Sequence, residues 1–176
     1  MMRVILILFF LLSSLNLANA ECNFKIKLGE DIKKIKNNTD TFNIRDTFML
    51  KKYSISSLNV CPNIIKDENI IINYTFIDDQ LAQIRVVVNN DENNTTSNQL
   101  LLMNYVKQTY GNFDTGTNPK IYNYFKSWKK NNKIIIYSRL RNKFNTIHEE
   151  LFITNKKYKE KMSALKLMIE KGEHKK

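Results

Sequence analysis

The sequence predicts an α+β fold, with a single domain built on a mainly antiparallel sheet of about five to seven strands in hairpins. Two or three helices are expected to pack on one face of this sheet. Runs rich in β-branched and aromatic residues recur in pairs around short polar turns. Two segments with helical periodicity follow such pairs. Hairpins outnumber strand–helix–strand units, which favours an antiparallel sheet over a parallel, doubly wound one.

The first 20 residues have the pattern of a cleaved signal peptide. Arg3 precedes an unbroken apolar run over residues 4–12, and Ala18 and Ala20 form a small-x-small cleavage site. The run is too short to cross a bilayer, since a spanning helix needs roughly 20 residues. We therefore expect a soluble periplasmic or secreted protein, with a single domain over residues 21–171 and a polar C-terminal tail over residues 172–176.

The mature chain contains two cysteines, Cys22 and Cys61. An oxidising compartment favours a disulfide bond between them, which would attach the new N-terminus to the fold. The alternative is a pair of buried free thiols.

The first half of the mature chain predicts strands and a short helix. Alternating apolar residues over 24–28 indicate a short strand, and a helical segment follows from Gly29. Residues 42–56 are expected to be extended. The clearest hairpin signal comes from the β-rich runs 70–77 and 81–88, which flank a short polar turn.

The second half predicts a helix, three strands and a final helix. The first helix begins at Ser97 and ends at Tyr110, where Gly111 follows in a C-cap position. Strands are predicted over residues 122–128, 133–140 and 147–154, and a final helix over residues 155–171.

Positive charge is concentrated at the C-terminal end of the chain. Residues 21–125 contain 12 Lys or Arg and 12 Asp or Glu, whereas residues 126–176 contain 15 and 5, a net charge of +10. Such a region would attract anionic lipid headgroups, acidic polysaccharide, nucleic acid or an acidic protein. The alternative is codon bias, because Asn, Lys and Ile, which AT-rich genomes favour, make up 68 of 176 residues.

A second hairpin carries the main candidate binding face. A two-residue turn at Asn131-Asn132 would place aromatic and cationic side chains together on one face and apolar side chains on the other. The mixed face could stack on sugar rings while its cations hold phosphates or carboxylates, or it could be a self-satisfied sheet surface. Its residues are Tyr122, Tyr124, Lys126, Trp128, Tyr137, Arg139 and Arg141, and the opposite face, expected in the core, contains Phe125, Ile134, Ile136 and Leu140.

The final helix is a second candidate surface, because it is basic and amphipathic. Such a helix could lie on an anionic membrane, or it could dock on the sheet with its lysines in water. We favour the docked interpretation. The lysines are Lys156, Lys157, Lys159, Lys161 and Lys166, and the apolar stripe contains Tyr158, Met162, Leu165 and Ile169.

No motif predicts catalysis, a metal or a cofactor. Phe152 stands where a zinc-protease HExxH pattern beginning at His148 requires its second histidine, and the four glycines form no phosphate-binding loop. We therefore expect a non-enzymatic binding module of the cell envelope. Its partner would be an anionic envelope component or an acidic protein, membrane-surface contact is compatible with the charge, and nucleic acid is disfavoured. The alternative is a hydrolase-like enzyme with a non-contiguous site around His148, Glu150 and Tyr137.

Overall fold

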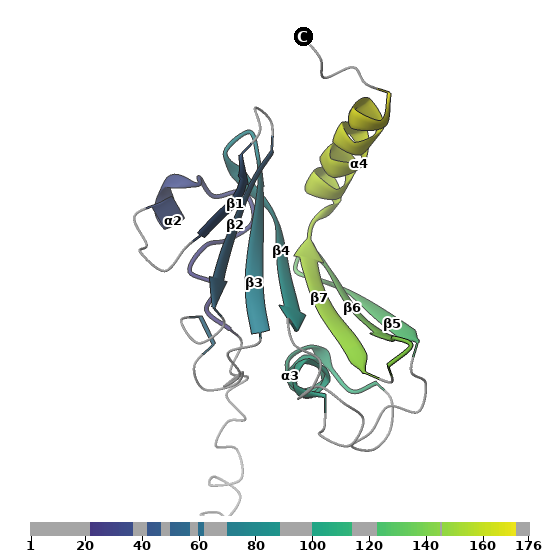
Figure 1. The fold of residues 1–176 in the computed structure, drawn as a ribbon. Coiled ribbons are helices and arrows are strands. Elements are labelled where there is room, and N and C mark those ends of the chain that lie inside the picture. Colours follow the sequence, from purple (N-terminus) through teal and green to yellow (C-terminus); the bar gives the residue numbers. More distant parts are fainter. Residues whose placement is uncertain are drawn as a thin grey trace, which may run out of the picture.

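A computed structural model shows one antiparallel sheet with helices packed against it (Figure 1). The predicted signal peptide and the C-terminal tail lie outside the residues that the structure describes, as does Tyr122 of the candidate binding face. The described residues are 22–36, 42–46, 50–56, 60–61, 70–88, 100–113, 123–144 and 146–171.

Over the described residues, the sheet has seven strands in the order β1-β2-β3-β4-β7-β6-β5, and every neighbouring pair is antiparallel. The first four strands form a meander, and the last three begin at the far edge of the sheet and return until β7 pairs with β4. The predicted α+β class is confirmed. The strands are β1 (Phe42–Asp46), β2 (Leu50–Ser56), β3 (Ile70–Ile77), β4 (Gln80–Val88), β5 (Tyr124–Lys130), β6 (Lys133–Arg141) and β7 (Ile147–Thr154).

Both predicted hairpins are confirmed, and both turn through two residues in the left-handed region. Asp78 and Asp79 have φ angles of 52° and 59°, and Asn131 and Asn132 have φ angles of 49° and 61°. Positive φ at both central residues is required by the turn whose twist matches that of the flanking strands, and Asn and Asp tolerate it best among non-glycine residues.

In the described part of the chain, three helices accompany the sheet: α2 (Lys33–Lys36), α3 (Leu101–Tyr110) and α4 (Lys156–Glu170). Gly111 ends α3 with a φ of 113°, and its N–H donates to the Lys107 carbonyl. The side chain of Asn155 caps α4 by accepting a hydrogen bond from the Tyr158 N–H. The end of α3 and the bounds of α4 agree with the sequence prediction to within one residue.

The strand predicted over residues 24–28 is wrong. Lys25 has a φ of 57°, which is incompatible with a strand, and its N–H donates to the Asn23 side chain. The alternation of apolar residues arises because the irregular segment packs Ile26 into the core. The segment docks on β4 through backbone hydrogen bonds from Gly29 to Leu81 and from Leu81 to Glu30.

The predicted disulfide is confirmed. Cys22 and Cys61 are bonded and buried, with 4.9 Å between their Cα atoms. In the chain-entropy model, closing a loop of this length contributes roughly 4 kcal/mol of stability. A disulfide is compatible with an oxidising, extracytoplasmic compartment. Within the described part of the chain, no helix has the length and apolar character needed to cross a membrane.

The core divides between the two faces of the sheet. The main cluster contains Ile72, Tyr74 and Phe76 of β3 together with the N-terminal segment and α3. Ile77 is one residue out of phase with these side chains, so it points to the opposite face, where it packs with Tyr158 and other residues of α4. The helices α3 and α4 therefore lie on opposite faces. This division differs from the single helix-covered face that we expected, because alternation in β3 leaves apolar residues on both faces near its end.

Candidate functional site

The predicted register of the β5–β6 hairpin is confirmed, but the centre of its mixed face is buried. Tyr124 pairs with Arg139, Lys126 with Tyr137, and Trp128 with Ile135. Tyr137 and Arg139 are both 0% exposed. Neither side chain can contact a ligand at the surface of this structure, and among the described candidates on this hairpin only Lys126 and Arg141 are exposed.

Aromatic packing explains why the centre of this face is inaccessible. Phe113, which follows α3, stacks on Tyr124 with 5.8 Å between ring centroids and contacts the rings of Trp128 and Tyr137 at 5.5 and 5.2 Å. Tyr110 of α3 lies 5.9 Å from Trp128. Aromatic pairs at these separations add stability beyond the area they bury. The side chains that resembled a ligand platform are instead the contact between the hairpin and the α3 region.

A buried polar cluster lies beneath this packing. Glu149 accepts hydrogen bonds through Oε1 from the Met103 backbone N–H at 2.9 Å and the Tyr137 hydroxyl at 2.5 Å. Burial first, and then the Glu149 charge, raise the pKa of the Tyr137 hydroxyl, so the phenol stays protonated. Arg139 donates to the Met103 sulfur at 3.3 Å and lies 4.8 Å from the centroid of the Tyr124 ring. These partners are internal, so the cluster has the character of a structural element.

Glu149 is a buried polar residue that was not predicted, although the sequence contains a signal for it. Along β7, Glu149 falls in phase with Ile147, Leu151 and Ile153, all of which are buried. A carboxylate in the apolar phase of a strand must find hydrogen-bond donors in the core, and such a residue can be recognised from alternation alone.

The face of the hairpin that we expected in the core is exposed instead. Phe125 is 72% exposed and Leu140 is 57% exposed, while Ile134 and Ile136 are half-buried. The expectation was wrong because apolar character was taken to identify the covered face. Here the α3 region covers the opposite side, and α4 packs on this side only beside the β3–β4 turn.

The groups proposed for a hydrolase-like site do not converge. His148 and Glu150 lie on one face of β7, and the His148 Nε2 is 2.9 Å from the Glu150 Oε1. Tyr137 points to the other face, toward Glu149. Partial burial raises the pKa of Glu150, but hydrogen bonds from Arg85 and His148 outweigh this effect and hold the pKa below its usual range. Glu150 therefore acts as a paired carboxylate on the sheet surface, with Arg85 donating to both of its oxygens.

The predicted basic helix, α4, docks on the sheet, in agreement with the interpretation that we favoured. Tyr158 and Leu165 are buried against Ile77 and Ala82, and Met162 packs beside them. The Tyr158 hydroxyl donates to Gln80 at 2.8 Å. Two of the candidate lysines are held on this side of the helix or next to it: Lys161 pairs with Asp78 at 2.9 Å, and Lys157 lies 5.1 Å from the Tyr158 ring centroid.

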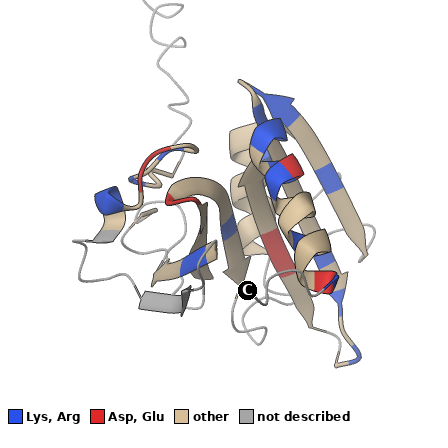
Figure 2. Ribbon diagram, turned by 90° about the horizontal axis from the view of Figure 1, so that it is seen from above, with Lys and Arg blue, Asp and Glu red and all other residues tan. Residues whose placement is uncertain are grey.

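The opposite side of α4 lines a groove of about 840 Å³ between the helix and the β5–β6 turn. Seen from above, α4 and the neighbouring strands carry several of the Lys and Arg positions (Figure 2). Among the residues that the structure describes, five lysines line the groove and Glu160 is the only acidic residue in its lining. The lysines are Lys129, Lys130 and Lys133 of the hairpin and Lys156 and Lys159 of α4. We call this site the lysine groove.

A second cavity, of about 630 Å³, lies on the other side of the same turn. Its lining includes Lys25, Lys27, Lys34 and Lys133, but Lys34 is paired with Glu30 at 2.6 Å. In the lysine groove, the one acidic residue reaches Lys156 only at 3.9 Å, with both side chains mostly exposed. The lysine groove is therefore the stronger site for an anion.

No family model, curated protein or solved structure matches this chain. Within the described residues, no group of three or more His, Cys, Asp or Glu side chains is placed to hold a metal ion. The lysine groove is the feature of the described structure that points most directly to a ligand.

Proposed function

We propose that this protein is an exported, non-enzymatic binding protein of the cell envelope that holds an anionic ligand in the lysine groove. The observation that carries the proposal is the lining of that groove by five lysines against one glutamate. An anion that contacts several of these lysines at once gains a favourable Coulomb interaction from each.

The two walls of the groove belong to different parts of the chain. The hairpin wall is set by the left-handed turn at Asn131-Asn132, and the helix wall by the docking of Tyr158 and Leu165. Both walls are anchored in the fold, so the lysine backbones are held in place before a ligand arrives. Preorganisation of this kind lowers the ordering cost of binding.

Polyphosphate tests the proposal, because it is a hydrophilic anion without any apolar part. The processed chain, which begins at Glu21, contains every residue of the described fold and is the form to use. We expect binding that weakens steeply as salt rises, as counterion screening requires. Replacing Lys129, Lys130 and Lys133 with Gln should reduce the affinity at least tenfold, if each lysine near the anion contributes about 1 kcal/mol.

The control removes the same charge from the other end of the same hairpin region. Lys126, Arg141 and Lys143 are exposed and do not line the groove. Their replacement with Gln should change polyphosphate affinity by less than about threefold, through the altered net charge alone. Equal losses of affinity in both variants would show that the groove is only part of a general basic surface. If the parent protein does not bind polyphosphate, the proposal is overturned. The proposal is also overturned if the protein binds an acidic protein but has no affinity for polyphosphate.

A further inference from the structure

We infer that the anionic ligand is the surface of an acidic phospholipid bilayer, and that the end of α4 inserts into it beside the lysine groove. The inference rests on the proposed function, since it names the partner of the same site. It is carried by a second observation on the same helix, an exposed apolar end.

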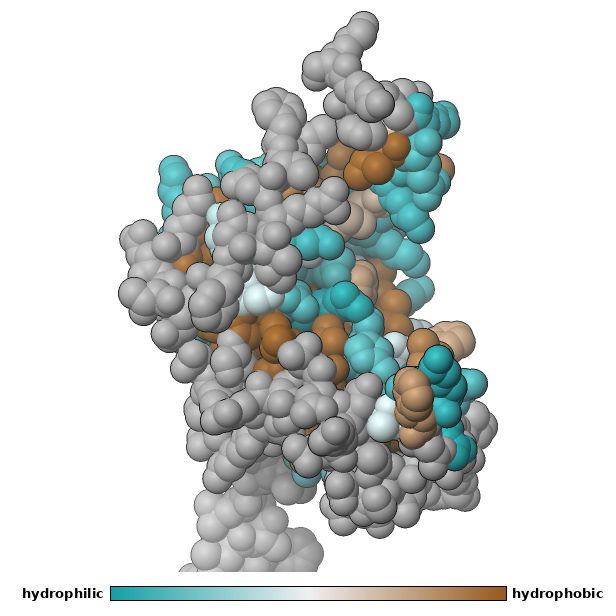
Figure 3. All heavy atoms as spheres, in the orientation of Figure 1, coloured by the Kyte–Doolittle hydropathy of each residue, from teal (hydrophilic) through white to brown (hydrophobic). Residues whose placement is uncertain are grey.

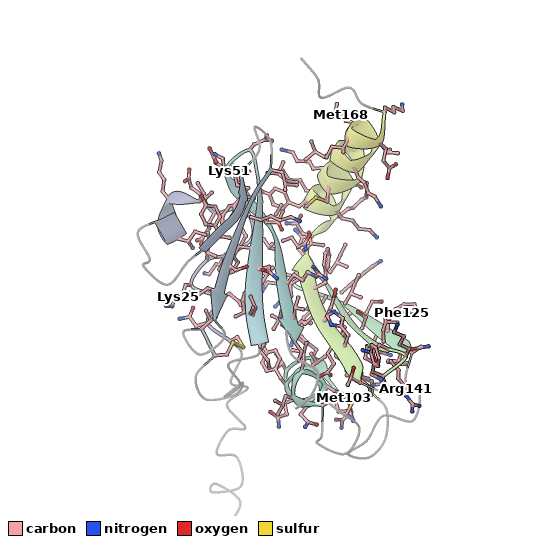
Figure 4. All side chains as sticks on the ribbon, in the orientation of Figure 1. Lys25, Lys51, Met103, Phe125, Arg141 and Met168 are labelled. Atoms are coloured by element: carbon pink, nitrogen blue, oxygen red, sulfur yellow. A yellow bond between two sulfur atoms is a disulfide. The ribbon has the colours of Figure 1, made fainter. Side chains whose placement is uncertain are left out.

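Three consecutive apolar residues lie in the last turn of α4. Leu167, Met168 and Ile169 are 56%, 45% and 50% exposed. Successive residues of a helix are rotated by about 100°, so these three side chains point in three different directions. We call them the apolar tip. Hydrophobic atoms are visible on the upper part of α4 in Figure 3, and Met168 is labelled there in Figure 4.

Docking on the sheet does not account for the apolar tip. Ile169 continues the stripe of Tyr158, Met162 and Leu165, but Ile169 is half exposed whereas Tyr158 and Leu165 are buried. The helix therefore extends past the part of the sheet that covers this stripe. Leu167 lies in a different stripe and lines the lysine groove. An apolar cluster that faces water on several sides at once is typical of an interaction site.

The groove and the apolar tip are continuous. Leu167 belongs to both, and Ile134 and Ala164 add further apolar surface to the groove between the lysines. A site with apolar walls and a cationic rim matches an amphiphile, whose headgroup is anionic and whose chains are apolar. A polysaccharide or polyphosphate would satisfy the lysines and leave the apolar residues in water.

An interfacial contact fits the composition of α4 better than deeper insertion. Its apolar tip is short and flanked by Lys166 and Lys171, whose charges favour the level of the headgroups. Lysines near an acidic membrane surface each contribute about 1 kcal/mol, so the groove lysines and the tip can act together. Electrostatic attraction would bring the protein to the membrane, and shallow burial of the tip would hold it there.

The test is cosedimentation of the processed protein with two kinds of vesicle, one of phosphatidylglycerol and phosphatidylcholine and one of phosphatidylcholine alone. Polyphosphate binding is measured in parallel. A tip variant replaces Met168 and Ile169, which do not line the groove, with Gln, which retains helix propensity. We expect this variant to bind acidic vesicles about tenfold more weakly or worse, because partial burial of two apolar side chains is lost. Its polyphosphate affinity should remain within about twofold of the parent, which also shows that the fold is intact.

A matched control replaces Phe125 and Leu140 with Thr. These residues are at least as exposed as the tip, and Phe125 lies at the end of the sheet away from Met168 (Figure 4). We expect its vesicle binding to be unchanged. Loss of vesicle binding in this control and not in the tip variant would overturn the inference, as would unaltered binding by the tip variant. Polyphosphate binding without vesicle binding would overturn the inference and leave the proposed function standing, and binding to neither would overturn both.

Discussion

The two faces of the β5–β6 hairpin have the reverse of the burial that their side chains suggest. The face with Tyr124, Tyr137 and Arg139 contains aromatic rings and a cation, and its central residues are buried. The other face contains Phe125 and Leu140, which are mostly exposed. The comparison shows that the identity of the covering element decides which face is core. Here the α3 region supplies aromatic partners for one face, and α4 covers only one end of the other.

The buried face accommodates its polar atoms because their partners come from several elements. Glu149 is held by a backbone N–H at the start of α3 and by a hydroxyl of β6. Arg139 lies directly across from Glu149 in the sheet register. Ionic groups in a core are stabilised only when such partners are in place. The exposed face has no comparable constraint, because its polar groups can be satisfied by water.

Among the substitutions that test this difference between the faces, removal of Glu149 should cause the largest loss of stability. Glu149→Ala would leave the guanidinium of Arg139 in the core without the carboxylate that faces it, and we expect a loss of about 3 to 5 kcal/mol of unfolding free energy. Urea denaturation of the oxidised protein measures this loss. Glu150→Ala, on the exposed face of the same strand, should cost about 1 kcal/mol or less, because that carboxylate is partly screened by solvent. Similar losses in the two variants would contradict the burial assignment.

Truncating one aromatic residue on each face tests the same contrast within a single strand. Trp128 contacts Tyr110 and Phe113, so Trp128→Ala should cost about 2 to 4 kcal/mol. Phe125→Ala removes a side chain that is mostly in water and should cost less than about 1 kcal/mol. Thermal unfolding of both variants under identical conditions gives the order. A larger effect at Phe125 would show that the hairpin packs with its other face inward.

The smallest effect concerns the pH dependence of Glu150. Its pKa in the folded protein is lowered from 4.5, so its pairing with Arg85 and His148 stabilises the fold above about pH 4.5 and is lost as the pH falls through the lowered value. The difference in unfolding free energy between the parent and Glu150→Gln should therefore be larger at about pH 5.5 than at about pH 3. A difference that grows on acidification would contradict this sign.

Much of the fold could be predicted because the signals were local. The turn at Asn131-Asn132 fixes the register of β5 and β6. The Asp78-Asp79 turn pairs Ile77 with Gln80, and the register of β3 and β4 then shifts between Phe76 and Thr75. Cys22 and Cys61 were paired correctly because the chain contains no other cysteine. The segment around Lys25 could not be predicted by alternation, because a single left-handed residue changes its path.

The candidate site could be predicted only in part. The lysines of α4 were identified, and three others that complete the groove come from the hairpin end of β5 and β6. What joins the two sets is the docking of Tyr158 beside the β3–β4 turn, a contact between residues 78 positions apart. Local patterns do not report contacts of this kind. The inward turn of Arg139 was missed for the same reason, because it depends on Phe113 and α3.

The most direct test of the lysine groove as the ligand site is lysine footprinting by acetylation and mass spectrometry, with and without polyphosphate. We predict that Lys129, Lys130, Lys133, Lys156 and Lys159 are protected by the ligand. Lys126 and Lys143, at the other end of the hairpin, should react at the same rate in both samples. Protection centred on Lys126 and Lys143, or equal protection of every exposed lysine, would contradict the account.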